Sequence, residues 1–175
     1  REVCAGSAEA AYFDGCCGWL RWDWDRARRG LRNAVRGMGR PEQLPRRVAA
    51  SFDPAAQAYE AHDFLQREVA ARALERLDYV SLVPARVLDI GAGTGRCARA
   101  LGARYRRAQV VQCDLALGML RASRAREPRF FSRQRFVAAD LEALPFHDGA
   151  FDLLFSSLAL QWSQDLGRAF AEARR

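Results

Sequence analysis

The sequence predicts an α/β fold in which helices flank a parallel β-sheet. Three observations support this prediction. Short apolar runs alternate with stretches of helical periodicity between residues 85 and 155. A glycine-rich turn follows the first of these runs, and an aspartate stands at or next to the end of each of the first three. A strand–helix–strand order at this spacing requires right-handed crossovers, which place the strands parallel to one another.

The chain before this region divides into two segments. Residues 1–46 show neither helical nor strand periodicity, and we expect a poorly structured extension there. Residues 47–84 form a predicted helical segment that begins at Asp53, which is a good N-cap and is followed by Pro54 in the first helical position. Four apolar residues at four-residue steps predict the packing stripe of this helix: Leu65, Val69, Ala73 and Leu77.

Residues 85–175 are expected to form the ligand-binding part of the fold. Four runs are predicted strands: Val87–Ile90, Val110–Cys113, Phe136–Ala139 and Phe151–Phe155. The stretches Cys97–Tyr105 and Ala116–Arg126 are predicted helices between the first three strands.

The turn after the first strand, Gly91 to Gly95, predicts a ligand-binding loop. Glycines allow a backbone to approach a ligand without a Cβ in the way, and ligands bind at the carboxyl ends of parallel strands. A tight turn without a ligand is the alternative, but it requires only one glycine. The dinucleotide fingerprint G-x-G-x-x-G fits poorly, because the third glycine comes one residue early and Arg96 occupies a position that this motif keeps small.

Three aspartates, Asp89, Asp114 and Asp140, are expected to meet at one rim of the sheet. Asp114 can accept hydrogen bonds from both hydroxyls of a ribose, or alternatively cap the helix predicted from Ala116. The carboxylate after the third strand can contact an adenine edge, and Met119 either offers this base an apolar face or belongs to the core. Carboxylates suit a positively charged nucleoside better than a pyrophosphate.

Charge and cysteine content narrow the functional classes. The net charge is +7, every basic residue is an arginine, and residues 96–135 hold eleven arginines against two acids. This excess either attracts an acidic partner, a nucleic acid or a membrane surface, or is a solvated surface produced by codon bias. No apolar run reaches the roughly 18 residues of a membrane span, and no secretory signal precedes the fold. Five cysteines without metal-ligand spacing predict no metal site and a cytoplasmic location.

Three stretches resemble motifs of class I S-adenosylmethionine-dependent methyltransferases, which have a Rossmann-like fold: VLDIGAGTG, VVQCDLALGML and FVAADLEALPFHDGAFDLLFSSLALQW. The narrower resemblance, over about residues 47–175, is to the malonyl-acyl-carrier-protein O-methyltransferase (BioC) family of biotin synthesis. It is carried by Phe155–Trp162 with Asp165-Leu166 and by the segment Phe52–Leu77. We expect a half-domain truncated after the fourth strand, because the family resemblance implies a sheet of more strands.

This resemblance implies that the cofactor is S-adenosyl-L-methionine. It implies ten donor-binding residues: Tyr59, Asp89, Gly91, Gly93, Gly95, Asp114, Leu115, Met119, Asp140 and Leu141. It also implies O-methylation of the free carboxylate of malonyl-acyl carrier protein or malonyl-CoA, with an acidic carrier protein docked on residues 96–135. A carboxylate is ionised at neutral pH, so no catalytic base is assigned, and His62 and His147 are expected in surface or capping roles.

Other functions are weighed against this one. A nucleic-acid methyltransferase that acts on amino groups is expected to carry an Asn/Asp-Pro-Pro-aromatic clamp after the fourth strand, where this chain has Ser156 to Ala159. Neither a nucleic acid nor a membrane is therefore expected as a partner. The mitochondrial complex I assembly factor has a similar SSL-x-L-x-W stretch and is linked to protein modification. A third hypothesis is a non-catalytic, truncated fragment that binds the donor.

Overall fold

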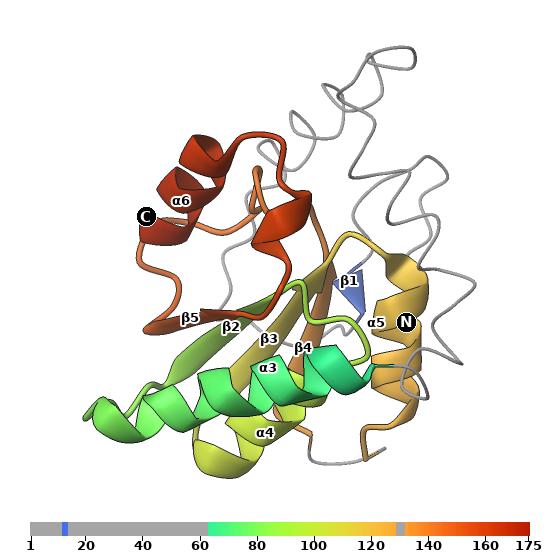
Figure 1. Cartoon of the computed structure of the whole chain (residues 1–175), viewed down its shortest axis with the longest axis vertical. Coiled ribbons are helices and arrows are strands. Elements are labelled where there is room, and N and C mark those ends of the chain that lie inside the picture. Colours follow the sequence, from blue (N-terminus) through green and yellow to red (C-terminus); the bar gives the residue numbers. More distant parts are fainter. Residues whose placement is uncertain (1–11, 14–62, 129–131) are drawn as a thin grey trace.

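The computed structural model describes residues 12–13, 63–128 and 132–175. These residues form a five-stranded sheet in the order β1-β4-β3-β2-β5 (Figure 1). The strands are β1 (Tyr12–Phe13), β2 (Arg86–Ile90), β3 (Gln109–Asp114), β4 (Gln134–Ala138) and β5 (Leu153–Ser156). Strands β4, β3, β2 and β5 are parallel, as predicted, and β1 pairs with β4 in the antiparallel sense.

The helices connect the strands and cover the sheet. They are α3 (Phe64–Glu75), η3 (Arg76–Tyr79), α4 (Arg96–Arg104), α5 (Leu117–Ala125), η4 (Leu160–Trp162) and α6 (Leu166–Arg174). Helices α3 and α4 lie against each other across the lower part of the sheet in the view of Figure 1, and α5 stands beside β4. In the described ranges, no helix has both the length and the apolar character needed to span a bilayer.

Alternating side chains of the central strands fill two cores. Val87 of β2 packs with Leu101 of α4 on one face of the sheet, and the next residue, Leu88, packs with Leu144 and Phe146 on the other. This alternation follows from the two-residue period of a strand, and both faces are apolar because a parallel sheet is covered on both sides. Full burial of each such side chain contributes about 1.5–3 kcal/mol.

A buried polar layer joins α4, α5, β3 and β4. The Gln112 side chain donates a hydrogen bond to Gln134 Oε1 over 3.2 Å and accepts one from the Ser123 hydroxyl over 2.6 Å. Gln134 in turn donates to the carbonyl oxygen of Ala98 over 3.0 Å. Gln112 and Ser123 are 0% exposed, so their hydrogen bonds replace those that water would make.

The packing face of the helical segment α3–η3 agrees with the prediction only in part, since Ala73 and Leu77 pack against the core as expected. Leu65 is 64% exposed, whereas Ala70 is buried and Ala73, Leu74 and Leu77 pack beside it. An α-helix advances 100° per residue, so a stripe of four-residue steps drifts about 40° per step around the helix. The packed residues follow the spacing i, i+3, i+4 and i+7 instead. The predicted helix start at Asp53 lies outside the described residues.

Two strands begin two residues away from their predicted starts, and the other strand boundaries agree to within one residue. Strand β4 begins two residues early, because Gln134 satisfies its side-chain amide within the buried polar layer. Strand β5 begins late, at Leu153, because Asp152 is engaged elsewhere: its Oδ2 accepts hydrogen bonds from the amides of Ala85 and Arg86. Tyr12 and Phe13 form β1 within the segment predicted to be unstructured, and the rest of residues 1–46 lies outside the described ranges.

Candidate functional site

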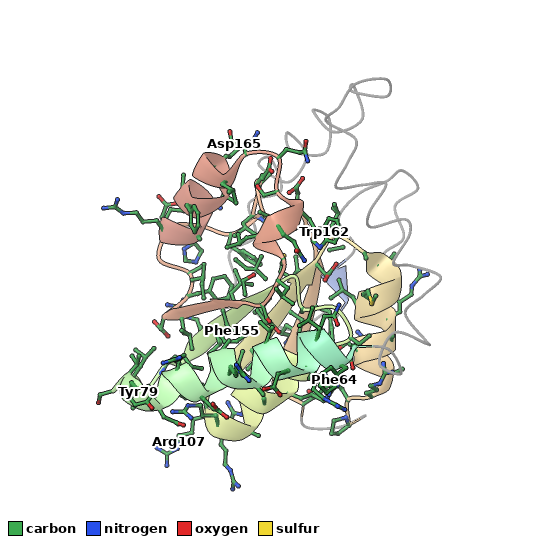
Figure 2. The ribbon with its side chains drawn as sticks, in the orientation of Figure 1. Phe64, Tyr79, Arg107, Phe155, Trp162 and Asp165 are labelled. Atoms are coloured by element: carbon green, nitrogen blue, oxygen red, sulfur yellow. The ribbon has the colours of Figure 1, made fainter. Side chains whose placement is uncertain are left out.

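The carboxyl ends of β2, β3 and β4 open into a cleft. The glycine-rich turn after β2 forms its floor, the first turns of α3 form one wall, and the segment that follows β5 forms another. Figure 2 shows Trp162 of this last segment at the upper side of the sheet, well away from Arg107 at the lower side. A cleft outside the carboxyl ends of parallel strands is the usual ligand site of an open α/β sheet.

The three predicted acids, Asp89, Asp114 and Asp140, all line this cleft. Each reaches it from a different strand end, because parallel strands bring their carboxyl ends to the same edge of the sheet. The prediction that these side chains meet at one rim is therefore confirmed. Their surroundings differ, and so does what each can do.

Asp89 is the most buried of the three acids. It is 1% exposed, and its Oδ2 has no hydrogen-bond partner within the described part of the chain. Burial and, to a smaller extent, the charge of Asp114 raise the pKa of Asp89 to about 7, against the lowering effect of a hydrogen bond from the Ala98 backbone. A buried carboxylate oxygen without a partner is costly, so this atom marks a place where a ligand donor or cation fits.

Asp114 ties the glycine-rich turn to the start of α5. Its Oδ2 accepts a hydrogen bond from the Gly93 amide and its Oδ1 accepts one from the Ala116 amide, both over 2.8 Å. The sequence left open whether this acid serves a ligand or the helix start. The structure shows a contact just before the helix, and it also places Asp114 in the cleft wall.

The glycines of the turn serve different purposes. Gly93 has a φ of +55° and lines the cleft, and a Cβ built on it would meet no heavy atom within 4 Å. Gly95 does not line the cleft. A Cβ there would lie 1.9 Å from Ser123 Oγ, so this glycine allows α5 and β3 to pack closely. Gly93 is therefore the open position of the turn, and Gly95 is a packing position.

The structure describes all but one of the remaining residues that were predicted to bind the donor. Gly91, Leu115, Met119 and Leu141 line the cleft, and Met119 is buried at 3% exposure. Tyr59 lies outside the described residues. Eight of the ten residues predicted to bind the donor therefore line one cleft.

An ion pair in the cleft wall was not predicted. Nη2 of Arg96 donates to Oδ2 of Asp63 over 2.6 Å, and both residues line the cleft. The sequence carried one signal for this site, since Arg96 is unusual directly after a glycine-rich turn. The partner could not be found, because local patterns do not pair residues that lie so far apart in the chain.

The segment after β5 was also not assigned to the site. Leu158 has a φ of +59°, a conformation that non-glycine residues rarely adopt, and it lines the cleft together with Trp162. Glu142 holds this segment in place: its Oε1 accepts hydrogen bonds from the Ser163 hydroxyl and from the amides of Gln164 and Asp165. The strained residue and the clamp indicate that the shape of this wall is imposed by its surroundings.

Two cysteines of the cleft wall remain thiols. Burial raises the pKa of Cys97 to about 12, and the charge of Asp89 adds to this effect. Burial and the charge of Asp114 also raise the pKa of Cys113. Because the thiolate is the reactive form, neither side chain is a nucleophile here. Within the described ranges, no group of three side chains could hold a metal ion.

Comparison with known proteins gives a consistent picture. Residues 88–175 match the family described as "Methyltransferase domain". A protein of Halorhodospira halophila named malonyl-[acyl-carrier protein] O-methyltransferase is 51% identical over 138 residues, which cover 78% of this chain and 46% of that protein. A protein of Methylovorus with the same name is 49% identical over 134 residues, covering 74% and 45%. The chain thus spans about half the length of the curated relatives that it matches.

A solved structure is also similar to this chain. It is Haemonchus contortus phosphoethanolamine N-methyltransferase 2 in complex with S-adenosyl-L-methionine. The sequence identity is 26% and the TM-score is 0.59, over 69% of this chain and 29% of that one.

Proposed function

Because this chain belongs to the methyltransferase-domain family, we propose that its cleft binds S-adenosyl-L-methionine and that the bound methyl group is transferred to a carboxylate. Membership of the family was predicted from the motifs around the glycine-rich turn and is confirmed. When bound, S-adenosyl-L-methionine supplies an electrophilic methyl group on a positively charged sulfur. The residues of the cleft hold this molecule, orient it and exclude water from it.

The single observation that carries donor binding is the state of Asp89. Its buried Oδ2 has no hydrogen-bond partner among the described residues, and Gly93, where a Cβ would meet no atom, lines the same cleft. An ammonium group is a strong hydrogen-bond donor and a positive charge, so it satisfies such an atom on both counts. A pyrophosphate would instead add negative charge to a cleft that already holds several carboxylates.

The order of the strands suggests how the donor lies. Asp140 follows β4, Asp114 is the last residue of β3 and Asp89 is the penultimate residue of β2. These three strands are consecutive neighbours in the sheet. The proposal places adenine near Asp140 and Leu141, the ribose hydroxyls at Asp114, and the methionine part at Asp89. A similar methyltransferase of known structure contains S-adenosyl-L-methionine, which supports this ligand class.

The proposed methyl acceptor is the free carboxylate of malonyl-acyl carrier protein. The names of the two curated relatives support this acceptor. A carboxylate is ionised at neutral pH, so the reaction needs no general base, and no histidine lies among the described residues that line the cleft. The contribution of the chain is alignment of the reactants and exclusion of water, for which the apolar wall of Leu158 and Trp162 is suited.

The arginines of residues 96–135 are distributed over both ends of the sheet. Arg107 and Arg133 precede β3 and β4, and Nη1 of Arg133 donates to the Arg107 carbonyl oxygen over 3.3 Å. Strands of this length place the amino ends and the carboxyl ends of the sheet about 16–20 Å apart. Arg121 and Arg124 instead lie exposed on α5, which begins at the cleft. The proposed docking surface for an acidic carrier protein is therefore the exposed face of α5.

Equilibrium dialysis with labelled S-adenosyl-L-methionine tests donor binding. The wild-type chain is expected to bind the donor, S-adenosylhomocysteine to compete, and a nicotinamide dinucleotide not to compete. Asp114→Ala is expected to weaken binding by about 10- to 100-fold, since it removes a charged acceptor of hydrogen bonds. Arg107→Gln, at the far edge of the sheet, is the matched control. Absence of binding by the wild-type chain would refute the proposal.

The acceptor is tested separately with carrier proteins that carry different acyl groups. The chain is incubated with donor labelled in the methyl group and with either malonyl or acetyl carrier protein. We expect label only on the malonyl form, as an ester that base hydrolyses, because the acetyl group has no free carboxylate. Equal labelling of both forms, or labelling of neither, would exclude this acceptor.

A further inference from the structure

The charged cleft residue Arg96 has no task in the proposed function. Arg96 occupies the first position of α4, directly after the glycine-rich turn, and lines the cleft. It is the one basic side chain among the described cleft-lining residues, whose acids are Asp63, Asp89, Asp114 and Asp140. A guanidinium in an acidic cleft can bind an anionic part of a ligand that the acids would repel.

The guanidinium of Arg96 is held by a buried acid. Asp63, the residue before α3, makes no side-chain cap for that helix and instead accepts a hydrogen bond from Arg96 Nη2 over 2.6 Å. The Asp63 side chain is 4% exposed and that of Arg96 is 35% exposed. An arginine has five N–H donors, and residues 63–128 and 132–175 supply no other acceptor to this one. The pair therefore fixes the guanidinium and, as far as the described residues are concerned, leaves most of its donors to a ligand.

The next step rests on the proposed function. With adenine at β4 and ribose at β3, the methionine part of the donor lies at the end of β2. The chain passes from β2 through the glycine-rich turn directly into α4, so Arg96 stands at this end of the cleft. The methionine part carries an ammonium and a carboxylate, and Asp89 can serve only the first of these groups.

We infer that Arg96 binds the carboxylate of the donor and that Asp63 positions it. A guanidinium matches a carboxylate with two parallel hydrogen bonds, which a point charge does not. Asp89 then binds the ammonium of the donor, and Arg96 binds its carboxylate. Arg96 thus selects a ligand that has a carboxylate at this end.

The experiment compares two ligands that differ only in this carboxylate. The wild-type 175-residue chain and Arg96→Gln are titrated calorimetrically with S-adenosyl-L-methionine and with decarboxylated S-adenosylmethionine. Arg96→Gln is expected to weaken binding of the first ligand by about 10- to 100-fold and to leave binding of the second unchanged. Arg96→Lys is expected to be intermediate for the first ligand. Arg107→Gln, an arginine outside the cleft, is expected to change neither.

The ligand that lacks the carboxylate also reports folding, since a variant that binds it normally has an intact cleft. An equal loss for both ligands, or no loss for either, would overturn the assignment of Arg96 while leaving the proposed function standing. Failure of the wild-type chain to bind either ligand would refute the proposed function itself, and this assignment with it. The two failures are therefore distinguishable.

Discussion

Burial of Asp89 makes the stability of the ligand-free chain depend on pH. The pKa of this carboxyl rises from 3.8 to about 7 on folding, because of burial and the charge of Asp114. Between these values the folded chain keeps a proton that the unfolded chain has lost, so the free energy of unfolding falls as the pH rises from about 4 to about 7. We predict that Asp89→Asn removes this fall and is more stable than wild type above about pH 7. Urea unfolding across this pH range measures the effect.

The control for this prediction is Glu75→Gln, which changes an exposed acid near the end of α3. Its stability is expected to follow the wild-type pH dependence. If Asp89→Asn followed that dependence as well, ionisation of the buried carboxyl would not be its source. Asp89→Asn is also expected to lose affinity for S-adenosyl-L-methionine. A variant that is more stable and yet binds the donor less well would show that this carboxyl serves binding and not stability.

Two glycines of the turn offer a matched comparison. Gly95→Ala places a Cβ 1.9 Å from Ser123 Oγ, and we predict a loss of about 2–4 kcal/mol in the free energy of unfolding, from overpacking and backbone strain together. Gly93→Ala meets no atom and is expected to cost only the strain, about 1–2 kcal/mol, but to reduce donor affinity. Denaturant unfolding and equilibrium dialysis of both variants test this contrast. Equal effects on stability would contradict it.

Eight of the ten residues that sequence reasoning assigned to the site line the cleft, and the limits of that reasoning are physical. A glycine pattern shows that the backbone needs freedom but not which neighbour requires it, so Gly95 was assigned to the ligand although it contacts α5. Aspartates at strand ends were predictable because parallel strands share one edge. The pair of Asp63 and Arg96 depends on how α3 crosses the sheet, which no local pattern encodes.

The buried polar layer stabilises the contact of α5 with the sheet. Ser123→Ala removes the hydroxyl that donates to Gln112 Oε1 and leaves this oxygen buried without that partner. We predict a loss of about 1–3 kcal/mol, the usual penalty for an unsatisfied buried acceptor. Urea unfolding measures it, with Arg121→Ala on the exposed side of the same helix as the control. A loss no larger than that of the control would show that the layer contributes nothing to stability.

The elements themselves were largely predictable, while their ends were not. All four parallel strands and both connecting helices, α4 and α5, have the expected positions, because apolar runs and helical periods are local properties. The boundaries shifted where a polar side chain had a distant partner, as at Gln134 and Asp152. The packing face of α3 shifted because a four-residue spacing allows two adjoining stripes, and contact with the core selects one.

At the scale of the whole molecule, the placement of charge allows a test of the proposed carrier-protein docking on α5. Arg121→Glu on α5 is expected to raise the KM for malonyl carrier protein by about 10-fold at low salt and to leave donor affinity unchanged. The matched change at the far edge, Arg107→Glu, is expected to have little effect on either. Steady-state kinetics at two salt concentrations tests this prediction. A larger effect at Arg107 would place the docking surface at the opposite edge.

The arrangement of the strands was beyond the reach of the sequence. The parallel sheet could be predicted from the alternation of strands and helices. The sequence pattern did not show that β5 pairs with β2 and not with β4. This pairing depends on the path of the loop between β4 and β5, which packs Leu144 and Phe146 against Leu88. It shapes the cleft, because it places the segment after β5 in the cleft wall.

The close approach of Gly91 and Ala159 has a consequence for sequence variation among homologues. A Cβ on residue 91 would lie 2.1 Å from that of Ala159, so neither position tolerates a larger side chain while the other stays as it is. The two positions are distant along the gene yet mutually constrained. Residues at these two positions should therefore covary among homologous sequences, and homologues with a bulkier residue at one of them should show a displaced strand end.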